Sequence, residues 1–482
     1  MGVVGTLCRQ CHLPGSLHRP GCRNSSQGRW SQPEGIPVER EGRMKHLQMP
    51  KFLSDIDFSL LAIMVALIGI GVLSIASAGI DAEGIRFSTE YVKQLIWAAT
   101  GTILVFIAMG IDISRLKDYT AFAYIALLLV LVYTRFAGRI VNGARSWIGL
   151  GSYGIQPSEF AKIATILFLA RYLDASEHRS SFHRLIVSGI IISIPVLLIL
   201  SQPDFGSALV FFPILVAMLY MGKIDIRYTL FIVLAMAVTF VLLILPLAGK
   251  FFFGPGNLID LFYQRTLLVN LVVYFFLIVL GLSAWGWLSF KKKYYFWLTY
   301  IFSVIDLSIV LSYLAHKVLK DYQIMRLMVF LNPNVDPQGA GWNIIQSVTA
   351  IGSGGLAGKG YLQGTQSHAR FIPQQSTDFI FSIIAEEWGL LGGVILIIFF
   401  GLLFYRIIAL IESTKDKYSM LVCSGLFGMF FFHFTINVGM AIGIMPITGI
   451  PLYFISYGGS SLWSAMTAVG LLLGISARRY RM

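Results

Sequence analysis

The sequence predicts an all-α polytopic membrane protein with about twelve transmembrane helices. Its 482 residues are 56% hydrophobic and only 13% charged, whereas soluble domains average about 25% charged residues. Apolar runs close to the ~20 residues that a helix needs to cross a bilayer recur along the chain from residue 58 onward. A spanning segment must satisfy its backbone hydrogen bonds internally, and apolar runs of this length do so as helices.

Twelve apolar segments follow a polar N-terminal stretch. Residues 1–50 are rich in Gly, Pro, Arg and Ser, which predicts a disordered extension that we expect to be cytoplasmic. The predicted spans are 58–79, 91–110, 119–135, 158–173, 184–201, 206–221, 227–248, 267–289, 295–315, 379–405, 417–442 and 460–476. The interval 316–378 is the longest between them, and ordered loops of such length are usually functional.

Basic residues orient the predicted spans. With the N-terminus inside, the basic loops all fall on the inner face, as the positive-inside rule requires. These loops are at 115–117, 171–184, 223–227, 291–293, 415–417 and 478–481. Residues 316–378 then form a large extracytoplasmic loop. The net charge of +13 therefore indicates anionic membrane lipids or an anionic substrate as partners, and not nucleic acid.

Ionisable side chains inside a membrane helix are costly and by default line a cavity or a site. Glu159 and Lys162 lie three residues apart after Pro157, so they share one helix face. They form either a mutual salt bridge or part of a site. Asp204 begins a span, where the helix dipole favours a carboxylate. Taken alone, Asp204 is more simply interpreted as a helix cap.

The 316–378 loop carries basic residues on the face where lysine and arginine are normally scarce. Arg326, Lys359 and Arg370 accompany a glycine-rich stretch at 350–360, and this combination suits an anionic phosphate group. The stretch is not a nucleotide-binding P-loop, because a glycine follows Lys359 where that motif has Ser or Thr. Alternatively, a solvated loop carries these charges without any function.

Three acids stand where this loop enters the membrane. Asp378 begins the next span and either caps that helix or serves as a site residue. At a helix N-terminus it is expected to keep a near-normal pKa and to stay ionised, because the dipole favours its charge. Glu386 and Glu387 are adjacent, so at least one faces the bundle interior, since a lipid-facing carboxylate would be costly.

Several long motifs occur in a fixed order along the chain. They are QPSEFAK (156–162), QPDFGSA (202–208), NPNVDPQGAGWNIIQS (332–347), AIGSGGLAGKG (350–360), TDFIF (377–381), AEEWG (385–389) and GIPLYFISYGGSS (449–461). On these motifs, residues 55–482 resemble the SEDS family of cell-wall synthases, which comprises the RodA, FtsW and SpoVE groups. Thr448 stands where the FtsW group typically has Lys, so the RodA group is the more similar one.

The resemblance implies a ten-helix core, so two of the twelve predicted spans form an inserted hairpin at 249–315. The remaining parts are the extension 1–50, the first part of the transmembrane core at 51–248, the extracytoplasmic loop 316–378 and the last part of the core at 379–482. Asp306 is the only charge within a span of the hairpin. We therefore expect the hairpin to be a peripheral addition that lies apart from the active centre.

The resemblance also implies a peptidoglycan glycosyltransferase. Such an enzyme polymerises lipid II with inversion into β-1,4 glycan strands during cell elongation and the maintenance of cell shape. It would lie in the bacterial cytoplasmic membrane with its active site on the outer face. Its partners would be a class B penicillin-binding protein and the elongation machinery.

Particular residues receive roles from this resemblance and from their charges. Asp378 aligns with the family's catalytic carboxylate and would act as the general base. The candidate substrate ligands are Glu159, Lys162, Asp204, Arg326, Lys359, Arg370 and Glu386. The sequence leaves open whether a divalent cation such as Mg²⁺ assists. Gln374 stands where the family commonly has Glu, which puts any role of that acid in doubt.

Two other functions would use the same residue types. A lipid II flippase would need a similar basic cavity, but transporters tend to show paired broken helices in two repeats. No such repeat is evident in this sequence. A subunit that only holds a partner enzyme would not explain acids placed inside the membrane. The glycosyltransferase is therefore the preferred interpretation, and the flippase is its alternative.

Overall fold

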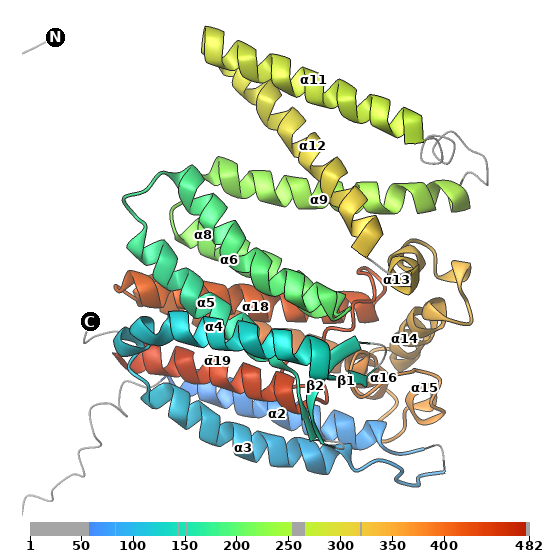
Figure 1. The fold of residues 1–482 in the computed structure, drawn as a ribbon. Coiled ribbons are helices and arrows are strands. Elements are labelled where there is room, and N and C mark those ends of the chain that lie inside the picture. The colour runs from blue at the N-terminus through green and yellow to red at the C-terminus, as the bar shows by residue number, and fades with distance from the viewer. Residues whose placement is uncertain are drawn as a thin grey trace, which may run out of the picture. The chain divides into compact units, whose positions relative to one another are not determined.

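The computed structural model of the chain describes residues 57–81, 83–141, 144–150, 153–252, 266–318 and 321–478. This described part consists of helices and one small antiparallel sheet (Figure 1). The extension at 1–50, for which disorder is predicted, lies outside the described residues. The all-α polytopic membrane fold predicted from the sequence is confirmed.

Helices precede and follow a three-stranded sheet of order β1-β2-β3. The sheet contains β1 (Arg139–Val141), β2 (Ala144–Leu150) and β3 (Tyr153–Ile155). The first helices are α2 (Phe58–Ala78), α3 (Glu90–Gly110), α4 (Ile113–Ala137), α5 (Pro157–Ala175), α6 (Ser181–Ser201), α7 (Phe205–Leu209), α8 (Phe211–Met221) and α9 (Ile226–Phe252). The later ones are α11 (Thr266–Phe290), α12 (Lys293–Val318), α13 (Asp321–Leu331), η1 (Pro333–Val335), α14 (Ala340–Gly354), α15 (Thr365–His368), α16 (Ile380–Glu387), α17 (Gly389–Ser413), α18 (Lys417–Ala441) and α19 (Gly459–Arg478).

Capping residues set several of these helix boundaries. Asp57 accepts hydrogen bonds from two backbone N–H groups at the start of α2, and Asp416 accepts one at the start of α18. Such bonds satisfy N–H groups that have no partner within the helix. Pro157 occupies the first turn of α5, where its missing N–H is of no consequence. Helix α5 therefore begins one residue before the predicted span 158–173.

Helices form at all twelve predicted spans, and ten helices within the described ranges are long and apolar enough to cross a membrane. The other two predicted spans differ in instructive ways. Helix α5 carries four charged residues, namely Glu159, Lys162, Arg171 and Asp174. The apolar run 206–221 is divided between α7 and α8 at Val210. The count of twelve spans stays a prediction.

A further predicted span, 379–405, is broken between α16 and α17. Gly389 begins α17 with a φ of +67°. A Cβ added at Gly389 would lie 2.3 Å from the backbone nitrogen of Gly358. Only glycine allows both this φ and this close approach, so the break requires Gly389. The break lets the chain after α14 pack directly against the junction of α16 and α17.

Helix α19 lies at the centre of the bundle, with 89% of its span buried. It packs along α3, and a Cβ added at Gly470 would lie 2.6 Å from the carbonyl oxygen of Val105. Small residues allow such close helix approach inside membranes. Helix α18 packs in turn against α5 and α8. These central helices hold the ends of the loops that form the site described below.

The predicted extracytoplasmic loop is largely helical. The end segment, which we define as residues 321–387, contains α13, η1, α14, α15 and α16 and lies at one end of the bundle (Figure 1). Apolar residues of this segment form a separate small core with the end of α18 and the chain after it. Its members are Val329, Ile344, Ala350, Ile372, Phe379, Met440 and Ile447. Their burial favours packed helices over an open loop.

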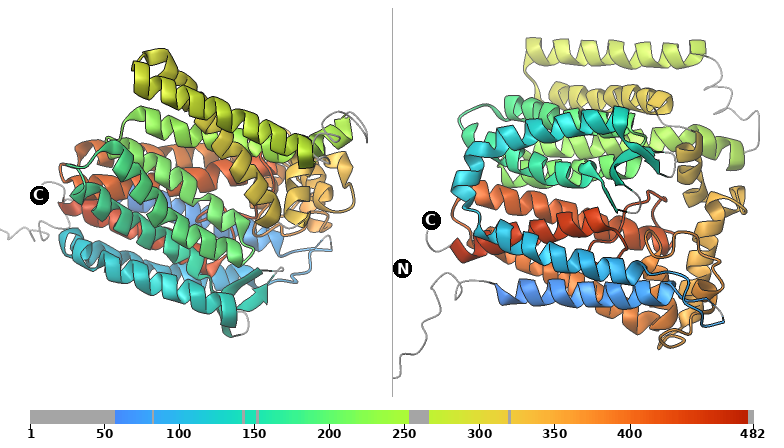
Figure 2. Two further views of the ribbon diagram at one scale, coloured as in Figure 1. Left: turned by 45° about the horizontal axis from the view of Figure 1, so that its top comes forward. Right: turned by 60° about the horizontal axis from the view of Figure 1, so that its bottom comes forward.

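The α11–α12 hairpin lies on the outside of the bundle next to α9 (Figure 2). Asp306 of α12 is buried, and neither carboxylate oxygen accepts a hydrogen bond from the part of the chain that the structure describes. The predicted hairpin at 249–315 contains α11 and most of α12, its first residues belong to the end of α9, and residues 253–265 lie outside the described ranges. That this hairpin is an insertion stays a prediction.

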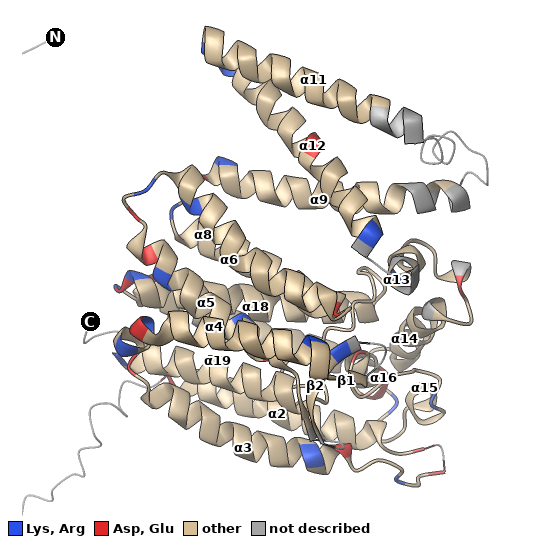
Figure 3. Cartoon of the chain, viewed as in Figure 1, with Lys and Arg blue, Asp and Glu red and all other residues tan. Residues whose placement is uncertain are grey.

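The short basic loops lie at the bundle end opposite the end segment. Following the helices from end to end places the α3–α4, α5–α6, α8–α9, α11–α12 and α17–α18 junctions together, away from α13–α16 (Figure 3). These junctions coincide with the loops expected on the inner face. By the positive-inside rule, the end segment should then face the outside of the cell.

This orientation can be tested with single cysteines in a variant whose four native cysteines are replaced. Leu356 is 73% exposed in the end segment, and Lys292 is exposed between α11 and α12. A membrane-impermeant maleimide added to intact cells should label Leu356→Cys. It should label Lys292→Cys only after the membrane is made permeable. Labelling in the reverse pattern would contradict the proposed orientation.

Candidate active site

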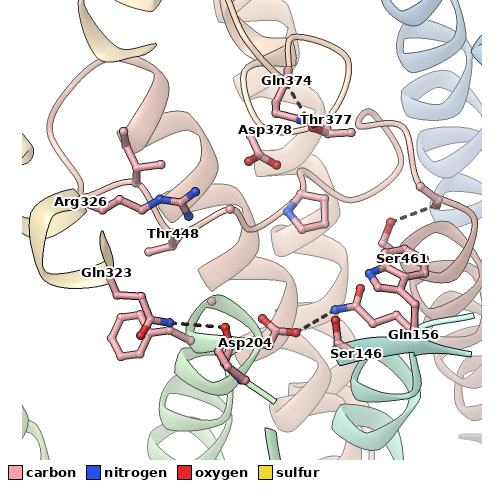
Figure 4. A pocket seen from close by; sticks show the side chains of 18 of the residues that line it. Ser146, Gln156, Asp204, Gln323, Arg326, Gln374, Thr377, Asp378, Thr448 and Ser461 are labelled. Carbon is pink, nitrogen blue, oxygen red and sulfur yellow. Dashed lines mark hydrogen bonds between the residues drawn. The ribbon is translucent and has the colours of Figure 1, made fainter. Parts of the chain in front are cut away.

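A cavity of about 260 Å³ opens at the bundle end that carries the end segment. Its walls come from α13, from the residues before α16, from the α6–α7 corner, from β2 and from the chain between α18 and α19 (Figure 4). The polar and charged side chains of the lining are Ser146, Gln156, Asp204, Gln323, Arg326, Gln374, Thr377, Asp378, Thr448, Tyr457 and Ser461. Segments far apart in the sequence therefore meet around one space.

Asp378 projects its carboxylate into this cavity (Figure 4). It does not cap α16, because Phe379 holds the cap position and no side chain caps that helix. Burial raises the pKa of Asp378 above its ordinary value of 3.8, against the opposing effects of the Arg326 guanidinium and a hydrogen bond from Thr377. The expectation of a near-normal pKa maintained by the helix dipole was wrong, because the carboxylate is not at the cap position and is buried.

The backbone of Asp378 is held from two directions. Its N–H donates to the Gln374 carbonyl oxygen at 3.0 Å. Its own carbonyl oxygen accepts a hydrogen bond of 2.9 Å from Asn437 Nδ2 on α18. Asn437 also donates to the Ile450 carbonyl at 2.8 Å and is fully buried. One amide thus joins the two chain segments that flank the cavity, a function that the sequence did not reveal.

Arg326 and Asp204 line the same cavity as Asp378. Asp204 caps α7, since its Oδ1 accepts a 3.1 Å hydrogen bond from the Ser207 N–H. Its Oδ2 accepts a 2.8 Å hydrogen bond from Gln156 Nε2. Burial raises the pKa of Asp204, and the hydrogen bonds from Ser207 oppose that shift. The capping interpretation of Asp204 is confirmed, and the residue faces the cavity as well.

Neutral polar residues of the lining were not predicted as site residues. Gln156 belongs to the QPSEFAK motif and Thr448 directly precedes the GIPLYFISYGGSS motif, whereas Gln323 and Ser146 lie outside every quoted motif. Amides and hydroxyls both donate and accept hydrogen bonds. A wall of such groups suits a polar ligand, and the Arg326 guanidinium offers a contact for an anionic part of it.

Glu159 and Lys162 do not line the cavity; they form a buried ion pair behind its wall. Lys162 Nζ lies 2.7 Å from Glu159 Oε1 and 3.1 Å from His433 Nε2. The hydroxyl of Tyr453 donates to Glu159 Oε2 at 3.0 Å. His433 Nδ1 is 2.9 Å from the carbonyl oxygen of Pro451, so Nδ1 carries the proton and Nε2 accepts from Lys162.

Lys359 and Glu386 form a second ion pair away from the cavity lining. Lys359 Nζ lies 2.9 Å from Glu386 Oε1. The Glu386 carboxylate also accepts hydrogen bonds from the backbone N–H groups of Thr365, Gln366 and Ser367. These contacts fasten the chain around α15 onto α16. Within the described ranges, both charges are therefore used to hold this part of the end segment in place.

Arg370 and Glu387 make further contacts in the same region. The Arg370 guanidinium stacks on the Phe87 ring with 3.5 Å to its centroid, a favourable cation–π contact. Glu387 accepts a hydrogen bond from Ser77 and lies 3.4 Å from His368 Nε2. Of the eight residues proposed from the sequence, Asp378, Asp204 and Arg326 meet at the cavity, and the other five lie outside its lining.

The two cavity carboxylates bear on the question of a divalent cation. No group of three or more His, Cys, Asp or Glu side chains in the described parts of the chain is placed to hold a metal ion. Asp204 and Asp378 are the acids that line the cavity. If a cation such as Mg²⁺ assists, these two residues would supply its protein ligands, since Mg²⁺ prefers carboxylate oxygens and keeps several waters.

Comparison with known proteins places this site in context. The family described as cell cycle protein, which groups FtsW, RodA and SpoVE, matches residues 58–251 and 262–481. The peptidoglycan glycosyltransferase RodA of Treponema pallidum is 47% identical over 427 residues, which cover 89% of this chain and 99% of that protein.

Solved structures agree with this match. A chain from a peptidoglycan synthase complex, described as coordinating polymerization and crosslinking, is 28% identical with a TM-score of 0.59. The alignment covers 89% of this chain and 99% of that one. The crystal structure of RodA from Thermus thermophilus is 25% identical with a TM-score of 0.56, again over 89% and 99% of the two chains.

The buried ion pair can be tested by its coupling. Removing either charge alone leaves the other buried without a partner, which costs about 3–5 kcal/mol, whereas removing both is often nearly neutral. We therefore expect Glu159→Gln and Lys162→Met each to lower the unfolding midpoint of the purified protein more than the double variant does. Midpoint shifts that simply add in the double variant would show that the two side chains are not coupled.

Proposed function

Because this chain belongs to the FtsW, RodA and SpoVE family and is a peptidoglycan glycosyltransferase, we propose that Asp378 is the general base of its polymerisation reaction. One observation carries the proposal: the carboxylate of Asp378 and the guanidinium of Arg326 line a single cavity at one end of the bundle. Glycosyl transfer from a diphosphate donor requires a base for the acceptor hydroxyl and stabilisation of the leaving diphosphate. These two side chains supply one requirement each.

The proposed substrate is lipid II, a disaccharide-peptide linked through pyrophosphate to undecaprenol. The acceptor hydroxyl attacks the anomeric carbon of the donor, and Asp378 takes up the hydroxyl proton as the new C–O bond forms. The bond from that carbon to the diphosphate breaks, and undecaprenyl diphosphate leaves with the electron pair. Attack from the opposite face inverts the α-linked donor and yields a β-1,4 glycan strand.

The environment of Asp378 supports this role. Burial raises its pKa, and a carboxylate with a raised pKa is a stronger base, better matched to proton transfer near neutral pH. Arg326 holds a positive charge near the same space. An arginine can bind a diphosphate through two parallel N–H···O contacts. Gln156, Gln323 and Ser146 would hydrogen-bond the hydroxyl and amide groups of the sugars.

We further propose that the cavity faces the outside of the bacterial cytoplasmic membrane. The basic junctions at the opposite bundle end support this orientation. A lipid-linked substrate would then keep its tail in the bilayer while its sugars reach Asp378. The synthase complex to which this chain is similar combines polymerization with crosslinking. A class B penicillin-binding protein within the elongation machinery is therefore the proposed partner.

The main alternative is a flippase for the same lipid. A flippase needs a path that substrate can follow from one membrane face to the other. The lining residues of the cavity all come from the bundle end that carries the end segment and from neighbouring loop and helix ends. This placement favours chemistry at one face of the membrane.

Asp378→Asn tests the assignment of the base. The amide keeps the size of the side chain but cannot take up the proton, and loss of a positioned base typically costs ~10²–10⁴ in rate. Purified Asp378→Asn protein with labelled lipid II should form almost no glycan polymer on a gel, while its unfolding midpoint stays close to that of the wild type.

Asp416→Asn is the matched control, because Asp416 caps α18 at the other end of the bundle and asparagine caps a helix about as well. This variant should polymerise lipid II normally. Near wild-type polymerisation by Asp378→Asn would show that the base lies elsewhere. If Asp378→Asn stops polymerisation but the wild type also moves lipid II across vesicles, flipping is a second activity.

Asn437→Leu tests how Asp378 is positioned. The substitution removes the hydrogen bonds to the Asp378 and Ile450 carbonyl oxygens. Because a small displacement of a reacting group can cost ~10²-fold in rate, kcat should fall while KM for lipid II changes little. Ser424→Ala is the control, since Ser424 is also buried on α18 but bonds only within its helix. A rise in KM with unchanged kcat would contradict a positioning role.

A further inference from the structure

Helix α12 of the inserted hairpin is joined to α9 along its length. The Tyr300 hydroxyl donates to the Arg227 carbonyl oxygen at 2.9 Å, and the Ser308 hydroxyl donates to the Ala235 carbonyl oxygen at 3.0 Å. The rings of Tyr300 and Phe231 meet edge to face with 5.6 Å between centroids. Helices α9 and α12 therefore act as one packed unit.

The end of α12 reaches the back of the cavity wall. Leu327 of α13 is buried in a small apolar cluster with Leu243 and Ile244 of α9. Ala315 of α12 and Phe205 of α7 pack against this cluster. Leu327 and Phe205 also line the cavity. The hairpin thus packs against an apolar cluster that shares Leu327 with the cavity wall.

Helix α13 links this cluster to the chemistry. It carries Gln323, Arg326 and Leu327, which all line the cavity. Leu327 follows Arg326 directly, so a shift of the buried leucine displaces the guanidinium as well. The chain also enters α13 soon after α12 ends at Val318. The hairpin, which was expected to lie apart from the active centre, therefore packs through Ala315 against a cluster that includes Leu327, the residue after Arg326.

We propose that the α11–α12 hairpin is a positioning element of the active site. Ala315 of α12, together with Leu243 and Ile244 of α9, holds α13 so that Arg326 meets the diphosphate of the substrate. The proposal rests on the proposed function, in which Arg326 binds that diphosphate. Paired hydrogen bonds from a guanidinium to phosphate oxygens need well-defined geometry. Productive sites hold such groups within about 0.5 Å, so the packing behind α13 sets catalytic efficiency.

Ala315→Phe tests the proposal by enlarging the side chain that packs behind α13. Because Ala315 is partly buried against the cluster, a phenyl ring there should push α13 away from its position. A misplacement of about 1 Å can cost ~10²-fold, so kcat/KM for lipid II polymerisation should fall by on the order of that factor. Leu314→Phe is the control, since Leu314 is the preceding residue and is 49% exposed.

The same substitution in Arg326→Lys protein separates a loss of Arg326 positioning from general damage to the fold. In Arg326→Lys protein the paired contact is already lost, so Ala315→Phe should add little further loss of kcat/KM. An equal fold loss in both backgrounds, or no loss in either, would overturn the proposal. If Ala315→Phe does not purify as folded protein, Ala315→Leu takes its place under the same criteria.

The same variants distinguish an error in the role of Arg326 from an error in the role of the hairpin. If Arg326→Lys polymerises lipid II at the wild-type rate, the role of Arg326 in the proposed function is wrong and the positioning proposal is wrong with it. If Arg326→Lys is slow and both Ala315 variants match Leu314→Phe, the proposed function stands and only the positioning role of the hairpin is wrong.

Discussion

The ion pair between Glu159 and Lys162 lies within α5 and has almost no solvent exposure. A lone charge inside a membrane bundle is strongly unfavourable, so each charge depends on the other and on their shared hydrogen bonds. Those bonds reach α18 through His433 and the chain before α19 through Tyr453. His433 in turn contacts Pro451, which lines the cavity. The position of the cavity wall therefore depends on this pair.

Other charges of the chain divide into those that hold structure and those that face the cavity. Lys359 and Glu386 satisfy each other and fasten the chain around α15. Asp378, Asp204 and Arg326 instead present charge to one space. Groups fixed in advance around a reacting centre stabilise developing charge without reorganisation at the moment of reaction. The charges of the first group therefore fix the scaffold, and those of the second group face the space proposed for the substrate.

The sequence predicted the helical membrane fold because apolar runs of spanning length leave few alternatives. It also indicated Asp378, Asp204 and Arg326 as candidate site residues, because charged residues at membrane spans often have a function. It could not separate these from Lys359 and Glu386, because residue type and spacing are the same for a ligand and for a structural ion pair. Helices α13, α14 and α15 of the end segment were missed, since this segment is stabilised by contacts with α18 and the chain after it.

Gln323 was not predicted as a site residue, although it lies three residues before the candidate Arg326 and so shares its helix face. The few charges of the hairpin predicted a peripheral element, and nothing in the sequence indicated that Ala315 packs against the apolar cluster that contains Leu327. Small apolar residues carry no functional signal in a membrane sequence, where they are common. Tertiary contacts decide the role of such residues.

The pH dependence of single-turnover polymerisation tests the central claim, that Asp378 acts as a base in the field of Arg326, most directly. The rate should rise with pH through one ionisation above the ordinary carboxyl pKa of 3.8, because burial raises the pKa of Asp378. Arg326 opposes that shift, so Arg326→Gln should move the ionisation to still higher pH. If the rate falls at the same acidic pH in Arg326→Gln protein as in the wild type, the account is contradicted.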